Sequence, residues 1–200
     1  GSIYWHMVSK LLLAVYEIIR DAINANEDPV LVGKLFDHYF EINAGIGAHK
    51  SPELYGAFPT DPYSHTPGGK GAQQPGMTGQ VKEDIISRFG ELGVRVTKGV
   101  LKFDPTILRS VEFLTSPQTF YYVSVTGEAC DIPLEKGTLA FTYCQVPIIY
   151  KKSKTATTEV VFQSGESQTF SSNQLDESLS SALFQRTNTI NKIIVSVLKE

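Results

Sequence analysis

The spacing of apolar residues changes at Gly93, and this change constrains the fold of the chain more than any other feature of its sequence. Before Gly93 the apolar residues recur every three or four positions, which predicts helices over 3–26, 28–44 and 79–92. After Gly93 they alternate with polar residues over short stretches, which is typical of strands buried on one face. A chain whose helices come first and whose strands come last is expected to adopt an α+β fold.

The first predicted helix is apolar around most of its circumference. Its main face carries apolar side chains at steps of three and four, namely Trp5, Val8, Leu12, Val15 and Ile19. Three further apolar residues widen this face: Leu11, Leu13 and Ile18. A helix of this kind is buried on more than one side. We therefore expect that either the strand-rich half covers it or partner helices that belong beside it are missing.

Residues 45–78, which connect the second and third predicted helices, are rich in Gly and Pro and show no sustained period. A structureless connection of more than about 15 residues is unusual in a compact domain, and is typically a binding loop or a disordered linker. This segment also contains many Tyr, Phe and His residues. Because disordered segments are poor in aromatic residues, the composition favours a binding loop.

The second half of the chain is predicted to be an antiparallel β-sandwich. A turn at Thr97-Lys98-Gly99 joins two strands within 94–103, and Gly and Pro punctuate the later strands at short intervals. These later strands are expected at 120–125, 139–143, 146–150, 159–162 and 190–197. The sequence thus predicts a helical segment over 3–93, including the loop 45–78, followed by a C-terminal β-sandwich over 94–200.

Composition excludes several classes of protein. The net charge of −3 over 200 residues argues against binding to a phosphate backbone, so no nucleic-acid partner is expected. No apolar stretch is long enough to span a bilayer, and the start of the chain lacks the features of a signal peptide. Two cysteines, Cys130 and Cys144, cannot form a disulfide framework or a four-ligand zinc site. No metal is therefore expected, and a reducing compartment, the cytoplasm, is favoured.

Several short motifs follow one another in a distinctive order. The run from Tyr55 to His65 reads Tyr-Gly-Ala-Phe-Pro-Thr-Asp-Pro-Tyr-Ser-His, and Gly-Ala-Gln-Gln-Pro-Gly-Met-Thr-Gly-Gln over 71–80 opens the third helix. That helix ends at Leu-Gly, and a strand pair and Phe-Asp-Pro over 103–105 follow. This order resembles the C-terminal stretch of cellobiose-phosphorylase-like enzymes and related (α/α)6-toroid glycosidases, in which the last toroid helices and a substrate-side loop precede a small β-sandwich. The resemblance implies that the chain is the tail of a longer enzyme whose other toroid helices lie upstream.

The start of the third helix is the strongest candidate site on physical grounds. Unpaired amides and the positive end of the helix dipole attract anions there, Gly79 permits close approach, and Thr78 offers a hydroxyl. The alternative is that Thr78 only caps the helix. In the resembled phosphorylases a Thr-Gly pair at a similar place contacts inorganic phosphate, together with a His and a Gln from the preceding loops. The resemblance therefore implies a phosphate site formed by Thr78, Gly79, His65 and Gln73 or Gln74, with inorganic phosphate as co-substrate and no other cofactor.

Aromatic and acidic residues of the same loop are candidate sugar contacts. Tyr55, Phe58 and Tyr63 offer ring faces that suit the C–H face of a sugar, but they would equally anchor the loop on the helices. Asp61 offers a carboxylate, or it initiates a turn together with the proline that follows. Glycoside cleavage requires a general acid, which in the resembled family lies upstream of this stretch. We therefore assign no catalytic residue and expect the isolated chain to lack the general acid.

The function predicted from these features is that of the C-terminal part of a glycoside phosphorylase or hydrolase, which contributes a sugar- and phosphate-side loop and a structural β-sandwich. The expected partners are a sugar or oligosaccharide and the remainder of the parent polypeptide, with no membrane. Two alternatives from other classes stay open. One is a non-catalytic carbohydrate-binding or structural module. The other is a scaffold whose first helix docks onto a partner, for which a homodimer is one arrangement.

Overall fold

The computed structural model describes residues 2–46 and 78–198 of the chain. By their internal contacts, they separate into two compact units, Gly1–Gly90 and Glu91–Glu200. The described residues contain four α-helices and mostly antiparallel sheets, so the predicted α+β class is confirmed. Among these helices, none combines the length and the apolar character needed to cross a membrane.

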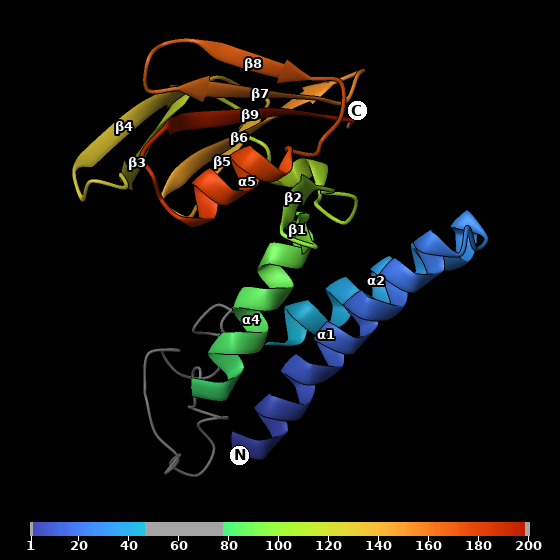
Figure 1. The fold of residues 1–200 in the computed structure, drawn as a ribbon. Helices are drawn as coiled ribbons and strands as arrows, with labels where there is room; N and C mark the ends of the chain where they lie inside the picture. Colours follow the sequence, from blue (N-terminus) through green and yellow to red (C-terminus); the bar gives the residue numbers. More distant parts are fainter. Residues whose placement is uncertain (1, 47–77, 199–200) are drawn as a thin grey trace. The chain divides into compact units, whose positions relative to one another are not determined.

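The first unit is built from helices, as the apolar period predicts. Its elements are α1 (Ser2–Asn24), α2 (Pro29–Gly45) and most of α4 (Thr78–Glu91) (Figure 1). Local chemistry sets the start of α2. Asp28 Oδ1 accepts a hydrogen bond from the amide of Val30 at 2.8 Å, and Pro29, which has no amide hydrogen, occupies the first helical position. The helix ends at Gly45, one residue beyond the predicted end at 44.

Helix α1 has apolar residues on two opposite faces, and only one of them is buried. Leu12, Tyr16 and Ile19 are almost inaccessible to solvent. On the other side of the helix, Met7, Leu11 and Ile18 are 63%, 52% and 53% exposed. The apolar character all round the helix is therefore present, whereas burial on more than one side is not observed among the described residues. We call Met7, Leu11, Ala14 and Ile18 the outer stripe of α1.

The described part of the second unit contains three sheets. Its strands are β1 (Val94–Thr97), β2 (Val100–Phe103), β3 (Gln118–Val123), β4 (Ala129–Leu134), β5 (Thr138–Tyr143), β6 (Val146–Ser153), β7 (Thr157–Phe162), β8 (Ser167–Phe170) and β9 (Ile190–Leu198). Two of the sheets are the hairpins β1-β2 and β3-β4, and the third is a five-stranded sheet in the order β5-β6-β9-β7-β8 (Figure 1). A 3-10 turn (Ser110–Glu112) follows β2, and helix α5 (Glu177–Phe184) separates β8 from β9.

The chain order of the five-stranded sheet departs from a simple succession of hairpins. After β8 the chain passes through α5 and returns as β9, which inserts between β6 and β7. Strand β9 is antiparallel to β7 but parallel to β6, so one pair differs from the predicted antiparallel arrangement. Parallel neighbours require a crossover connection, and the segment that contains α5 is part of that connection. Strands β4 and β8 and helix α5 were not predicted from the sequence.

The core of the second unit surrounds β9. Ile193 and Val195 on β9, Ile148 and Tyr150 on β6, and Val160 on β7 are each fully buried. The Tyr150 hydroxyl donates a hydrogen bond to the Leu92 carbonyl oxygen at 2.5 Å. Burial raises the pKa of the Tyr150 hydroxyl above its usual range, so the group stays protonated and keeps donating. This bond joins the sheet to the segment that leads into β1.

Helix α5 is attached to β2 by one buried serine. The Ser180 hydroxyl accepts a hydrogen bond from the Leu101 amide at 3.0 Å and donates one to the Asp176 carbonyl oxygen at 2.7 Å. The Asp176 side chain also caps the helix, because its Oδ1 accepts from the Leu179 amide at 2.7 Å. These bonds bring the end of β2 close to the segment between β8 and α5, and a cleft forms there.

Candidate functional site

Most of the site residues predicted from the sequence lie outside the described residues. These are Tyr55, Phe58, Asp61, Tyr63, His65, Gln73 and Gln74. Thr78 and Gly79 are the first two residues of α4, so the predicted helix begins where the anion site was expected. Their side chains also lie outside the described part of the chain. The predicted phosphate and sugar contacts therefore remain predictions.

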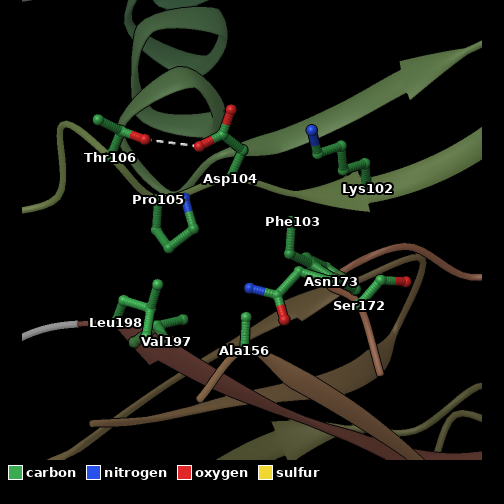
Figure 2. Close-up of a pocket in the computed structure, with 10 residues that line it drawn as sticks. All are labelled: Lys102, Phe103, Asp104, Pro105, Thr106, Ala156, Ser172, Asn173, Val197 and Leu198. Atoms are coloured by element: carbon green, nitrogen blue, oxygen red, sulfur yellow. Dashed lines mark hydrogen bonds between the residues drawn. The ribbon is translucent and has the colours of Figure 1, made fainter. Parts of the chain in front are cut away.

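Within the second unit the structure shows a different candidate site, an open cleft of about 480 Å³ (Figure 2). Its residues come from four separate segments: the end of β2 and the turn after it, the loop before β7, the loop after β8, and the end of β9. The lining residues are Lys102, Phe103, Asp104, Pro105, Thr106, Ala156, Ser172, Asn173, Val197 and Leu198. A cleft of this size is within the range of small-molecule sites.

The carboxylate of Asp104 is held in place by two neighbours. Thr106 Oγ1 donates a hydrogen bond to Asp104 Oδ1 at 2.6 Å, and Arg95 Nη1 lies 3.3 Å from Asp104 Oδ2. The Asp104 amide in turn donates to the Gly93 carbonyl oxygen at 2.8 Å. Because the ion pair offsets the negative charge, Asp104 presents a fixed acceptor without making the cleft strongly anionic.

Asn173 is the least satisfied polar residue of the cleft. Its carbonyl oxygen accepts a hydrogen bond from the Phe103 amide at 2.8 Å, which fixes the backbone beside β2. Its side chain extends into the cleft (Figure 2). Asn173 Oδ1 is buried and has no hydrogen-bond partner among the described residues. A buried amide oxygen without a partner carries a free-energy cost. The nitrogen of the same amide is the atom through which Asn173 can contact a ligand (Figure 2).

The cleft combines hydrogen-bonding groups of both kinds with an apolar floor. Lys102 and the amide of Asn173 supply donors, Asp104 supplies an acceptor, and Ser172 supplies a hydroxyl that does either. Pro105, Ala156, Val197 and Leu198 supply the apolar part. This chemistry suits a compact ligand that carries several hydroxyl groups on an apolar ring. Asp104 carries the one carboxylate among the ten described lining residues.

Sequence reasoning did not identify this cleft. Phe103-Asp104-Pro105 contributes to the family resemblance alone, and Ser172 and Asn173 lie in a polar run that is typical of an ordinary loop. The two segments meet through the isolated bridge between Lys102 and Gln174. That bridge joins positions far apart in sequence, and no local pattern predicts it. The Asp104-Pro105 pair, which favours a turn, is the one signal that could have drawn attention to the site.

Comparison with known proteins finds no matching protein-family model and no matching curated protein.

In the described part of the chain, no cluster of three or more His, Cys, Asp or Glu side chains is arranged to hold a metal ion. Cys130 and Cys144 are free and half-buried. Burial raises the pKa of the Cys144 thiol, an effect that the nearby Arg186 partly offsets.

Proposed function

We propose that the chain is the C-terminal part of a carbohydrate-active enzyme, either a glycoside phosphorylase or a glycoside hydrolase. In this proposal the helices are the last elements of an (α/α)6 toroid, and residues 94–200 are a structural β-sandwich. Support comes from the order of the sequence motifs. It also comes from the order of the two units, because a helical unit precedes a strand-rich unit. The proposed compartment is the cytoplasm.

The observation that carries this proposal is the outer stripe of α1. Met7, Leu11, Ala14 and Ile18 follow one another at steps of four, three and four, which is the spacing of a helix-packing seam. Their exposure leaves this seam without a partner in the described residues. A helix inside a toroid contacts neighbours on both sides, so we propose the remainder of the parent polypeptide as the partner of the stripe.

The proposed contribution of the chain to chemistry is the loop over 45–78. Thr78, Gly79, His65 and Gln73 or Gln74 would hold inorganic phosphate, and Tyr55, Phe58, Asp61 and Tyr63 would contact the sugar. In a phosphorylase the phosphate attacks the anomeric carbon, and in a hydrolase a carboxylate-activated water takes its place. The general acid comes from outside this chain in either case.

Titration with inorganic phosphate tests the phosphorylase version. We expect saturable binding in the millimolar range, measured by calorimetry, because a helix N-terminus and a neighbouring imidazole both favour an anion. Thr78→Val should weaken this binding several-fold, whereas Thr97→Val, a change of the same kind at an exposed position on β1, should not. Absence of binding throughout this range would remove the phosphate version.

A second candidate function is a non-catalytic carbohydrate-binding module, and the cleft favours it. The lining residues of the cleft supply hydrogen-bond donors, an acceptor and apolar surface, which suit a sugar ring with several hydroxyl groups. They include one carboxylate, that of Asp104. Replacement of Asn173 by Ala should weaken binding of a monosaccharide or disaccharide by about three- to tenfold, because one amide hydrogen bond is lost. The exposed Gln168 on β8 offers a control, since Gln168→Ala removes an amide outside the cleft. Equal affinity of the Asn173→Ala variant and the unaltered chain would argue against the cleft as a sugar site.

A further inference from the structure

The hairpin β3-β4 presents an exposed aromatic ring that the cleft does not use. Tyr121 is 78% exposed and Val123 is 55% exposed. Because side chains alternate along a strand, these two residues share one face of β3. The register places Asp131 opposite Tyr121 and Ala129 opposite Val123. An open groove of about 480 Å³ is lined by these four residues together with Tyr122 and Cys130, which occupy the alternate positions of the two strands. We call Tyr121, Val123, Ala129 and Asp131 the outer face of the hairpin.

The opposite face and the tip of the hairpin anchor the strand that carries the exposed ring. Phe120 and Tyr122 are half-buried, and their rings stack with centroids 5.9 Å apart and planes inclined by 10°. Just beyond β3, the Gln145 side-chain amide donates a hydrogen bond to the Ser124 carbonyl oxygen at 3.0 Å. An aromatic side chain with few rotatable bonds on an anchored strand loses little entropy when a ligand covers it.

The outer face has the chemistry of a saccharide contact. The ring of Tyr121 offers a flat apolar surface that suits the C–H face of a pyranose, and its hydroxyl remains available at the edge. Residues directly opposite in an antiparallel pair have Cβ atoms roughly 5 Å apart, so the Asp131 side chain begins next to that of Tyr121. There it can accept hydrogen bonds from the hydroxyl groups that project around a sugar lying on the ring. Val123 extends the apolar surface along the strand.

Charge and size argue against other occupants. A nucleic-acid base also stacks on tyrosine, but it brings phosphates, and the groove is lined by Asp131 and by no Lys or Arg. A stable protein partner covers about 800 Å² on each side with several anchors. The outer face instead offers one exposed aromatic ring, with Val123, Ala129 and Asp131 as its neighbours. The ligand that fits the outer face is therefore a neutral oligosaccharide, whose rings carry several hydroxyl groups.

We propose that the outer face of the β3-β4 hairpin is an accessory saccharide-binding surface, with Tyr121 as the stacking platform and Asp131 as the hydroxyl acceptor. The proposal rests on the carbohydrate function proposed above, to which it adds a second contact that shares no residue with the cleft. Such a surface would hold a polysaccharide near the enzyme, while the reaction takes place elsewhere.

Calorimetric titration of the full chain with cellohexaose, maltohexaose and xylohexaose tests the proposal. We expect at least one hexasaccharide to bind and Tyr121→Ala to weaken that binding by about tenfold, since the stacking contact is lost. Tyr121→Phe and Tyr121→Trp should retain the affinity, because both keep a ring face. Asp131→Ala should weaken it by about threefold. Val111→Ala, at another exposed position, should leave it unchanged.

The outcomes separate this proposal from the more general one. If Tyr121→Ala binds as tightly as the unaltered chain while Asn173→Ala binds more weakly, the accessory surface is disproved and the carbohydrate function stands. If none of the three hexasaccharides binds, the accessory surface is also disproved, and phosphate titration is then the remaining test of the enzyme. Loss of affinity in Tyr121→Phe as well as Tyr121→Ala would show that the hydroxyl, not stacking, is responsible, and would overturn the proposed role. Thermal denaturation of each variant confirms that it is folded.

Discussion

Replacement of Gly93 by Ala is expected to destabilise the second unit by about 3–5 kcal/mol, which approaches the whole stability of many small domains. Gly93 has a φ angle of 70°, a region that residues with a Cβ rarely adopt. A Cβ at this position would lie 2.1 Å from the Asp104 carbonyl carbon and 2.2 Å from its oxygen. These are backbone atoms, and the bond between the Asp104 amide and the Gly93 carbonyl keeps them close.

Gly99 provides the matched control for this prediction. It also has a positive φ angle, 79°, but a Cβ added there would meet nothing within 4 Å. Gly99→Ala should therefore show only the backbone cost, about 1–2 kcal/mol. Unfolding of both variants by denaturant gives the two free energies. A similar loss in both would mean that the contact at Asp104 relaxes without cost, which would contradict the prediction.

Replacement of Ile193 by Ala is expected to cost about 2–5 kcal/mol, because it opens a cavity in the centre of the sheet. Ile193 is completely buried on β9. It is paired with Ile148 on β6 and with Val160 on β7, and both of these residues are also buried. Neither neighbour can move into the space without breaking its own contacts, so the cavity should remain largely open.

The adjacent residue on β9 serves for comparison. Ile194 faces the other side of the sheet and is half-buried. Ile194→Ala removes the same atoms from a less enclosed position, so it should cost clearly less than Ile193→Ala. Denaturant unfolding with both circular dichroism and tyrosine fluorescence would report the two values and show whether the transition is two-state. Equal losses would indicate that the two faces of β9 are buried alike.

The sequence predicted those parts of the fold that depend on neighbouring residues. The start of α2 follows from Asp28 and Pro29, which act within one helical turn. The hairpin β1-β2 follows from Lys98 and Gly99, which both have positive φ angles and form a two-residue turn between the strands. At these positions the residues that determine the local structure lie within the same short stretch of sequence as the structure itself.

The parts that were missed depend on residues far apart in the chain. Nothing in the composition of β9 specifies that it pairs in parallel with β6, because that choice follows from the crossover through α5. The cleft is assembled from four segments and depends on contacts such as that of the Phe103 amide with Asn173. Asp176 and Glu177 did carry a local signal for α5, an N-cap followed by an acidic first turn. Helix α5 has only 8 residues and follows a polar stretch, so its N-cap and acidic first turn did not stand out in the sequence.

The position of β9 has a consequence for how the chain acquires its structure. It is the last of the described strands in sequence and the middle strand of its sheet. During synthesis β6 and β7 therefore emerge with unpaired inner edges, which are open to pairing with other chains until β9 arrives. The sheet also depends on contacts between distant positions, which slows folding. Completion of this sheet should thus wait until β9 has been synthesised, and it should be sensitive to temperature and to protein concentration.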